Sequence, residues 1–112
     1  MKVSFEGIGE QVVSFAANGE VKGAFVKMSS NGTVAACSAA ENFMGYCINA
    51  EDGFADVQTH GYITCPYTGT APHVGYNQLT ADANGKVKTA QTGREYLVLD
   101  VDTTANTLGF IM

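Results

Sequence analysis

Residues Arg94–Met112 have the sequence REYLVLDVDTTANTLGFIM, and this stretch decides the fold class. Two runs rich in branched and aromatic residues, Glu95–Val101 and Thr107–Met112, flank a short polar turn, which is the pattern of a β-hairpin. Similar runs recur along the chain at Gln11–Phe15, Ala24–Met28, Thr33–Ala36, Asn42–Asn49, Phe54–Thr59, Tyr62–Cys65, Gln78–Ala81 and Lys86–Thr89. The sequence therefore predicts an all-β domain of about eight to ten short strands, a barrel (β-tulip-like included) or a sandwich.

The connections between these runs carry residues that tight turns require. Asn31-Gly32, Asp52-Gly53 and Asn84-Gly85 adopt positive φ at low cost, and Asn-Gly between β runs is a strong hairpin signal. The best helix candidate, Val34–Met44, has no convincing N-terminal cap and no leucine stripe. We interpret it as the end of a strand followed by a loop.

A weak internal repeat accompanies the strand pattern. A shift of 53 residues places Asn31–Val34 on Asn84–Val87, and it also places Ile48 on Val101. Two explanations stay open: two similar β modules, or convergence of hairpin turn chemistry. The segment Pro66–Gly75 contains both prolines, and it is predicted to be a surface loop or a crossover between the two modules.

Length and charge narrow the function. The chain has 112 residues, enough for one domain, and a net charge of −5 with its six basic residues scattered, so nucleic acid and anionic membranes are not expected partners. No apolar run approaches the ~20 residues of a membrane span. Glu6 and Glu10 interrupt the N-terminal apolar run, so no export signal is expected. Only 15% of residues are charged, which suggests a Thr-, Ser-, Asn- and Gly-rich surface or burial against a partner.

The residues that could carry catalysis form no familiar motif. Three cysteines, Cys37, Cys47 and Cys65, include no C-x-x-C pair and are expected to be free thiols in a reducing compartment. Cys65 with His60 or His73 is the one conceivable nucleophilic pair, but Cys65 ends a predicted strand, where no helix N-terminus lowers its pKa. These residues are therefore expected to be structural, and the chain is expected not to be an enzyme.

A metal site is likewise not expected. It could draw only on His60, His73, Cys65 and Asp56, whose spacing matches no metal-binding pattern. We predict no catalytic, cofactor-binding or metal site.

Several segments, in this order, carry a resemblance: Gly9–Val13, Val21–Val26, Asn31–Val34, a strand containing Gly45, Val57–Tyr62, Asp82–Val87 and the C-terminal hairpin. Over most of its length the chain resembles the small head-decoration, or head-stabilising, proteins of tailed phages and prophages. It departs from that family at Ala24-Phe25, where an acidic residue and a proline are more usual.

The resemblance implies a β-barrel or β-tulip-like module that is made in the bacterial cytoplasm and binds the outside of a capsid. Its partners would be the major capsid protein and further copies of itself, as a homotrimer, with no cofactor. Residues 1–10 would form an N-terminal arm or first strand, and residues 11–112 the β domain. The residues expected to contact the capsid or a neighbouring copy are Val3, Phe5, Ile8, Tyr67 and Tyr76.

Two other functions remain open. A small β-sandwich that binds carbohydrate would need exposed aromatic side chains on one face, for which Tyr62, Tyr67 and Tyr76 are the candidates. A minor head–tail connector or tail component would also be small and rich in strands.

Overall fold

The computed structural model describes residues 10–83 and 85–112, and this part of the chain is built from ten β-strands and contains no helix. The strands are β1 (Gln11–Ala17), β2 (Phe25–Ser30), β3 (Thr33–Ala36), β4 (Gly45–Glu51), β5 (Phe54–His60), β6 (Tyr62–Thr68), β7 (Gly75–Asp82), β8 (Lys86–Thr89), β9 (Arg94–Asp102) and β10 (Thr107–Ile111). Every predicted run falls on one of them. The all-β prediction is therefore confirmed.

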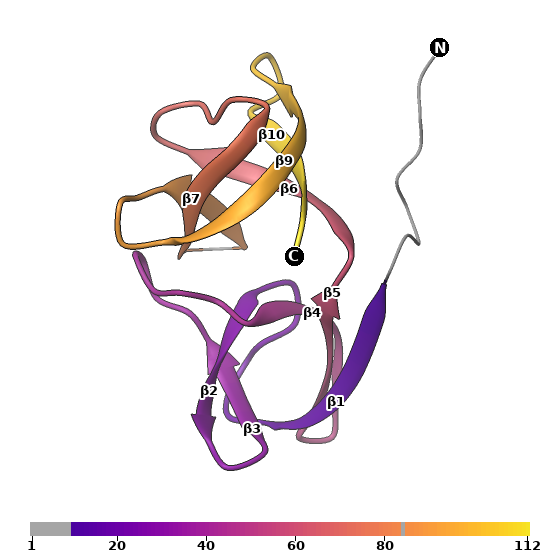
Figure 1. Ribbon diagram of the computed structural model, residues 1–112. Coiled ribbons are helices and arrows are strands. Elements are labelled where there is room, and N and C mark those ends of the chain that lie inside the picture. Colours follow the sequence, from indigo (N-terminus) through magenta and orange to yellow (C-terminus); the bar gives the residue numbers. More distant parts are fainter. Residues whose placement is uncertain (1–9, 84) are drawn as a thin grey trace.

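The strands form two closed barrels that follow one another along the chain (Figure 1). The first has the strand order β1-β3-β2-β4-β5, and the second has the order β10-β6-β8-β7-β9. Of the alternatives left open by the sequence, the barrel is the one observed. Closure protects most backbone edges, because nearly every strand has a neighbour on both sides.

The two barrels share one topology. In each, the first strand pairs in parallel with the third, and all other neighbours are antiparallel. The registers also correspond: Ala17 lies opposite Val34 in the first barrel, as Tyr67 lies opposite Val87 in the second. Both valines are fully buried. The predicted repeat is thus a repeated module, with the expected shift of 53 residues at β3 and β8.

The repeat prediction needs one correction. Ile48 corresponds to Leu99 rather than to Val101, because each is the unpaired extra residue where its strand bulges. The shift between β4 and β9 is consequently 51 residues. The cause is turn length: Asp52 and Gly53 alone connect β4 to β5, whereas four residues, 103–106, connect β9 to β10.

A second correction concerns Pro66–Gly75. Strand β6 continues through Pro66 to Thr68, so the predicted loop begins later and lies inside the second barrel. Pro66 is tolerated there because it pairs with β10 on one side only, and pairing with β8 begins at Tyr67. The junction between the barrels is instead the single residue Gly61, whose φ of 104° suits glycine.

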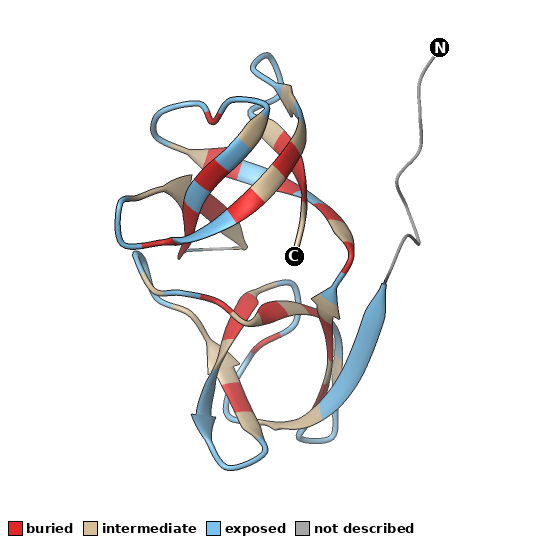
Figure 2. Cartoon of the chain, viewed as in Figure 1, coloured by how far each residue is buried: buried red, intermediate tan, exposed pale blue. Residues whose placement is uncertain are grey.

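Two groups of buried side chains hold the barrels together (Figure 2). The first barrel encloses Val21, Val26, Val34, Cys47, Ala55 and Val57. The second encloses a larger cluster that also takes in Phe25 and Phe43 from the first barrel. The Phe43 ring stacks on Tyr96 with 5.1 Å between centroids, and Phe25 lies 6.4 Å from Phe110. The barrels therefore share an aromatic core at their contact.

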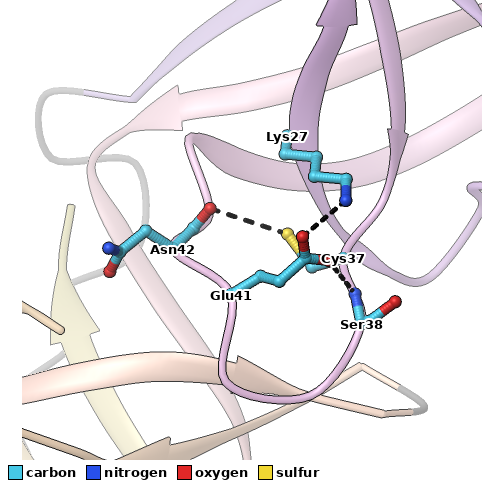
Figure 3. A network of polar contacts seen from close by, with 5 residues as sticks. All are labelled: Lys27, Cys37, Ser38, Glu41 and Asn42. Atoms are coloured by element: carbon cyan, nitrogen blue, oxygen red, sulfur yellow. Dashed lines mark hydrogen bonds and ion pairs between the residues drawn. The ribbon is translucent and has the colours of Figure 1, made fainter. Parts of the chain in front are cut away.

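The loop between β3 and β4 reinforces this contact. Its backbone pairs with Ala81 of β7: the Ala40 nitrogen donates to the Ala81 oxygen, and the Ala81 nitrogen donates to the Glu41 oxygen, both at 2.9 Å. Figure 3 shows how Glu41 shapes the loop by accepting hydrogen bonds from Lys27 Nζ and the Ser38 nitrogen, each at 2.6 Å. These bonds, that from Lys27 first, lower the pKa of Glu41.

Candidate interaction surfaces

The candidate nucleophile Cys65 points into the second barrel. It is almost fully buried, and this burial raises the pKa of its thiol to about 12. His60 is exposed, with Nδ1 3.1 Å from the Thr59 hydroxyl, and His73 lies on the exposed loop before β7. Within residues 10–83 and 85–112, no hydrogen bond or ion pair joins either histidine to Cys65.

The candidate metal ligands are also dispersed. No group of three or more histidine, cysteine or acidic side chains lies together among the described residues. Asp56 instead accepts a hydrogen bond from the Ser14 hydroxyl at 2.6 Å. All three cysteines are free thiols. No helix long and apolar enough to cross a membrane occurs in the described part.

The predicted contact residues differ widely in exposure. Val3, Phe5 and Ile8 lie outside the described residues. Tyr67 is 8% exposed, because its ring belongs to the second core, and its hydroxyl donates to Asn106 Oδ1 at 3.4 Å. Tyr76 is 66% exposed. Of these last two, only Tyr76 offers a partner substantial surface.

The first candidate surface is one edge of β1. Residues 11–16 of β1 pair with β5 along one edge, whereas only Ala16 and Ala17 pair with β3 on the other. No described residue pairs with the second edge along Gln11–Phe15, which we call the open edge. This part of β1 runs along the outside of the first barrel, with residues 11–14 exposed (Figures 1 and 2). An unpaired edge can accept a further strand.

The open edge lacks the residues that usually prevent strand addition. Natural edge strands commonly carry a charge or a proline. Strand β1, with the sequence QVVSFAA, has neither, and Val12 is 45% exposed. The corresponding position in β6 is instead a proline, since Ala16 matches Pro66 in the shared register.

The second candidate surface is an open groove of about 800 Å³ on the second barrel. It lies between the loop before β7 and the loop between β8 and β9. The residues that line it are mostly polar: Thr70, Ala71, His73, Tyr76, Asn77, Gln78, Thr89, Ala90, Gln91 and Glu95. We call it the Tyr76 groove. Its lining includes one carboxylate and no lysine or arginine.

Hydrogen bonds hold the floor of the Tyr76 groove. The Asn77 amide nitrogen donates to the backbone oxygens of His73 at 2.6 Å and Gly75 at 3.1 Å, while its oxygen accepts from the His73 nitrogen. Gln78 Nε2 donates to the Gly93 oxygen at 3.2 Å. These bonds fix the backbone on both sides of Tyr76. They explain why Asn77, a polar residue, is buried.

The comparisons with known proteins add no relative: no family model, curated protein or solved structure matches the chain. Function is therefore argued from the open edge and the Tyr76 groove. Sequence reasoning identified Tyr76 but not the groove, because residues from β7, β8, β9 and two loops meet there only in the folded barrel. The absence of charge in β1 was a signal for the open edge.

Proposed function

We propose that this chain is a structural protein that binds the outer surface of a tailed-phage capsid and stabilises the assembled shell. The observation that carries the proposal is the open edge of β1, which has neither charge nor proline along Gln11–Ala17. The resemblance to head-decoration proteins supplies the identity of the partner. The mode of binding is addition of an extended capsid segment to the first barrel.

Strand addition suits a surface of this composition. Backbone hydrogen bonds supply affinity with little dependence on side chains, and exposed Val12 and Val13 add apolar contact. In sequence, Val3, Phe5 and Ile8 precede this strand directly, so the proposed arm and the open edge would act as one continuous binding element. Their partner would be the major capsid protein.

The stabilising effect follows from mass action. A protein that binds the assembled shell and not its separated subunits lowers the free energy of the assembled form. Many copies on one shell, each a member of a homotrimer that contacts neighbouring capsid subunits, would add avidity to a modest affinity at each site. Neither step needs a cofactor or a reaction.

The proposal is tested by counting copies in particles. Particles induced from the source strain are purified by density, and quantitative mass spectrometry gives the ratio of this chain to the major capsid protein. A ratio near one supports a shell-coating protein. A few copies per particle would assign the chain to the connector or tail, and absence from the particles would overturn a virion role.

A pair of variants tests the open edge itself. Val12→Lys places a charge on the edge, which natural sheets use to block strand addition, and we expect at least a tenfold lower copy number per particle. Met28→Lys is the control, because Met28 is equally exposed at 47% but lies on β2, which has neighbours on both sides. Equal incorporation of the two variants would contradict binding through β1.

A further inference from the structure

The Tyr76 groove has a counterpart in the first barrel, and that counterpart is covered. By the shift of 53 residues that relates β2 to β7 and β3 to β8, Gly23 matches Tyr76, Phe25 matches Gln78 and Cys37 matches Ala90. All three residues of the first barrel lie where it meets the second. Phe25 and Cys37 pack on the second core, and the Gly23 oxygen lies against Gly85. The Tyr76 groove is therefore the same face of the module, left open in the second barrel.

The chemistry of this face changes between the two barrels. Phe25 is 2% exposed among aromatic rings, whereas its counterpart Gln78 is an exposed amide. A glycine in the first barrel is replaced by Tyr76, whose ring stands 66% exposed in the groove. The face that docks a protein in the first barrel has thus become a polar groove with one aromatic surface in the second.

These groups select a class of ligand. An exposed tyrosine ring packs against the C–H face of a sugar ring, and surrounding amides and hydroxyls bond to its hydroxyl groups. Gln91 and Glu95 form no side-chain hydrogen bond with any residue that the structure describes, so their polar atoms are available to a ligand. With Glu95 present and no basic side chain in the lining, the groove disfavours anions.

The size and rigidity of the groove agree with this class. Its volume of about 800 Å³ lies within the range of small-molecule sites, roughly 300–1,000 Å³, and accommodates a short oligosaccharide. The bonds of Asn77 to the His73 backbone hold the loop beside Tyr76 before a ligand arrives. A preformed site loses less conformational entropy on binding.

We propose that the second barrel binds a neutral saccharide in the Tyr76 groove, with the ring of Tyr76 as the stacking surface and Gln78, Gln91, Thr89 and Glu95 as hydrogen-bonding partners. This site is separate from the open edge of β1. A capsid-bound copy would hold its first barrel against the shell and present the groove of the second to external glycans.

The test uses the isolated full chain, so its result is independent of capsid binding. The chain is screened on an array of neutral oligosaccharides, and the strongest binder is titrated into ¹⁵N-labelled protein. We expect binding, with amide shift changes concentrated at Tyr76, Gln91 and Glu95. No neutral binder on the array, or shift changes confined to the first barrel, would overturn the proposal.

Variants then identify the stacking surface. Tyr76→Ala is expected to weaken the affinity about tenfold or more, and Tyr76→Phe, which keeps the ring, by less than about threefold. Phe54→Ala is the matched control, because Phe54 is 63% exposed on the first barrel. Thermal unfolding verifies that each variant is folded. An unchanged affinity in Tyr76→Ala, or association of two chains through the groove without saccharide binding, would overturn the proposal.

Discussion

Gly85 of the second barrel lies directly against Gly23 of the first: a β-carbon at position 85 would stand 2.5 Å from the Gly23 carbonyl oxygen. Both glycines have a φ of 73°. The contact is between two backbones, so it leaves no room for even a methyl group unless the barrels separate. It lies beside the aromatic contact of Phe25 and Phe43 and helps fix how the two modules meet.

We predict that Gly85→Ala destabilises the protein more than the matched substitution Gly32→Ala. Gly32 occupies the same hairpin position in the first barrel with a φ of 65°, but an added β-carbon there meets no atom within 4 Å. Both variants carry the backbone penalty of about 1 kcal/mol or more at positive φ. Only Gly85→Ala adds the clash. Urea unfolding measures both, and equal losses would show that the contact is not a constraint.

The aromatic contact makes a second prediction. Phe43→Ala should lower the free energy of unfolding by about 3–5 kcal/mol, because it removes a buried ring that stacks on Tyr96 and leaves a cavity between the barrels. Phe54→Ala should cost less than about 1 kcal/mol, since Phe54 is largely exposed. Chemical denaturation of both variants measures the difference. A small effect at Phe43 would contradict a shared core.

The loop of Figure 3 provides a third prediction, with a local readout. Glu41→Gln removes the ion pair with Lys27 and should make the β3–β4 loop less ordered. Because the Ala81 amide donates to the Glu41 backbone oxygen, its hydrogen exchange should become faster, while the Val87 amide inside the second barrel changes little. Unchanged exchange at Ala81 would mean that the backbone pairing holds without the side chain.

Stability should also fall at high pH. Burial raises the pKa of the Cys65 thiol from 9.0 to about 12, so the unfolded chain releases this proton first. The contribution to stability is complete below about pH 9 and is lost as pH rises toward 12, with a slope of at most about 1.4 kcal/mol per pH unit. Burial also raises the pKa of Tyr96, which adds loss of the same sign.

Cys65→Ala isolates the thiol in this prediction. Its stability is measured by urea unfolding at several pH values from 8 upward, beside the unsubstituted chain. The variant should lose stability less steeply above about pH 9, whatever its stability at neutral pH. Parallel curves would contradict the assignment of the loss to Cys65.

Much of the fold could be predicted from the sequence because local signals agree with it. Asn31-Gly32 and Asp52-Gly53 sit in the predicted turns, and strands such as Thr33–Ala36 and Lys86–Thr89 have the expected bounds. Strand order was not predictable, since the parallel pairing of β1 with β3 depends on contacts between segments distant in sequence. Loop length similarly hid the shift between β4 and β9.

The candidate surfaces were less predictable than the strands. Tyr67 and Tyr76 look alike in sequence, yet one ring lies in the second core and the other lies in solvent. What separates them is which way each strand faces once the barrel has closed. The open edge could be inferred only in part, because the lack of charge in QVVSFAA is visible but the short pairing of β1 with β3 is not.

The single residue between the barrels makes this chain a natural candidate for division. A cut at Gly61 would give two fragments, each with all five strands of a closed barrel. Fragments of about 50 residues are marginal alone, and the first would expose Phe25 and Phe43. Recombination would restore the shared aromatic core, so folding and reassociation would be coupled. The duplicated module thus offers a split-protein pair whose two halves recognise each other through a face that one has and the other has lost.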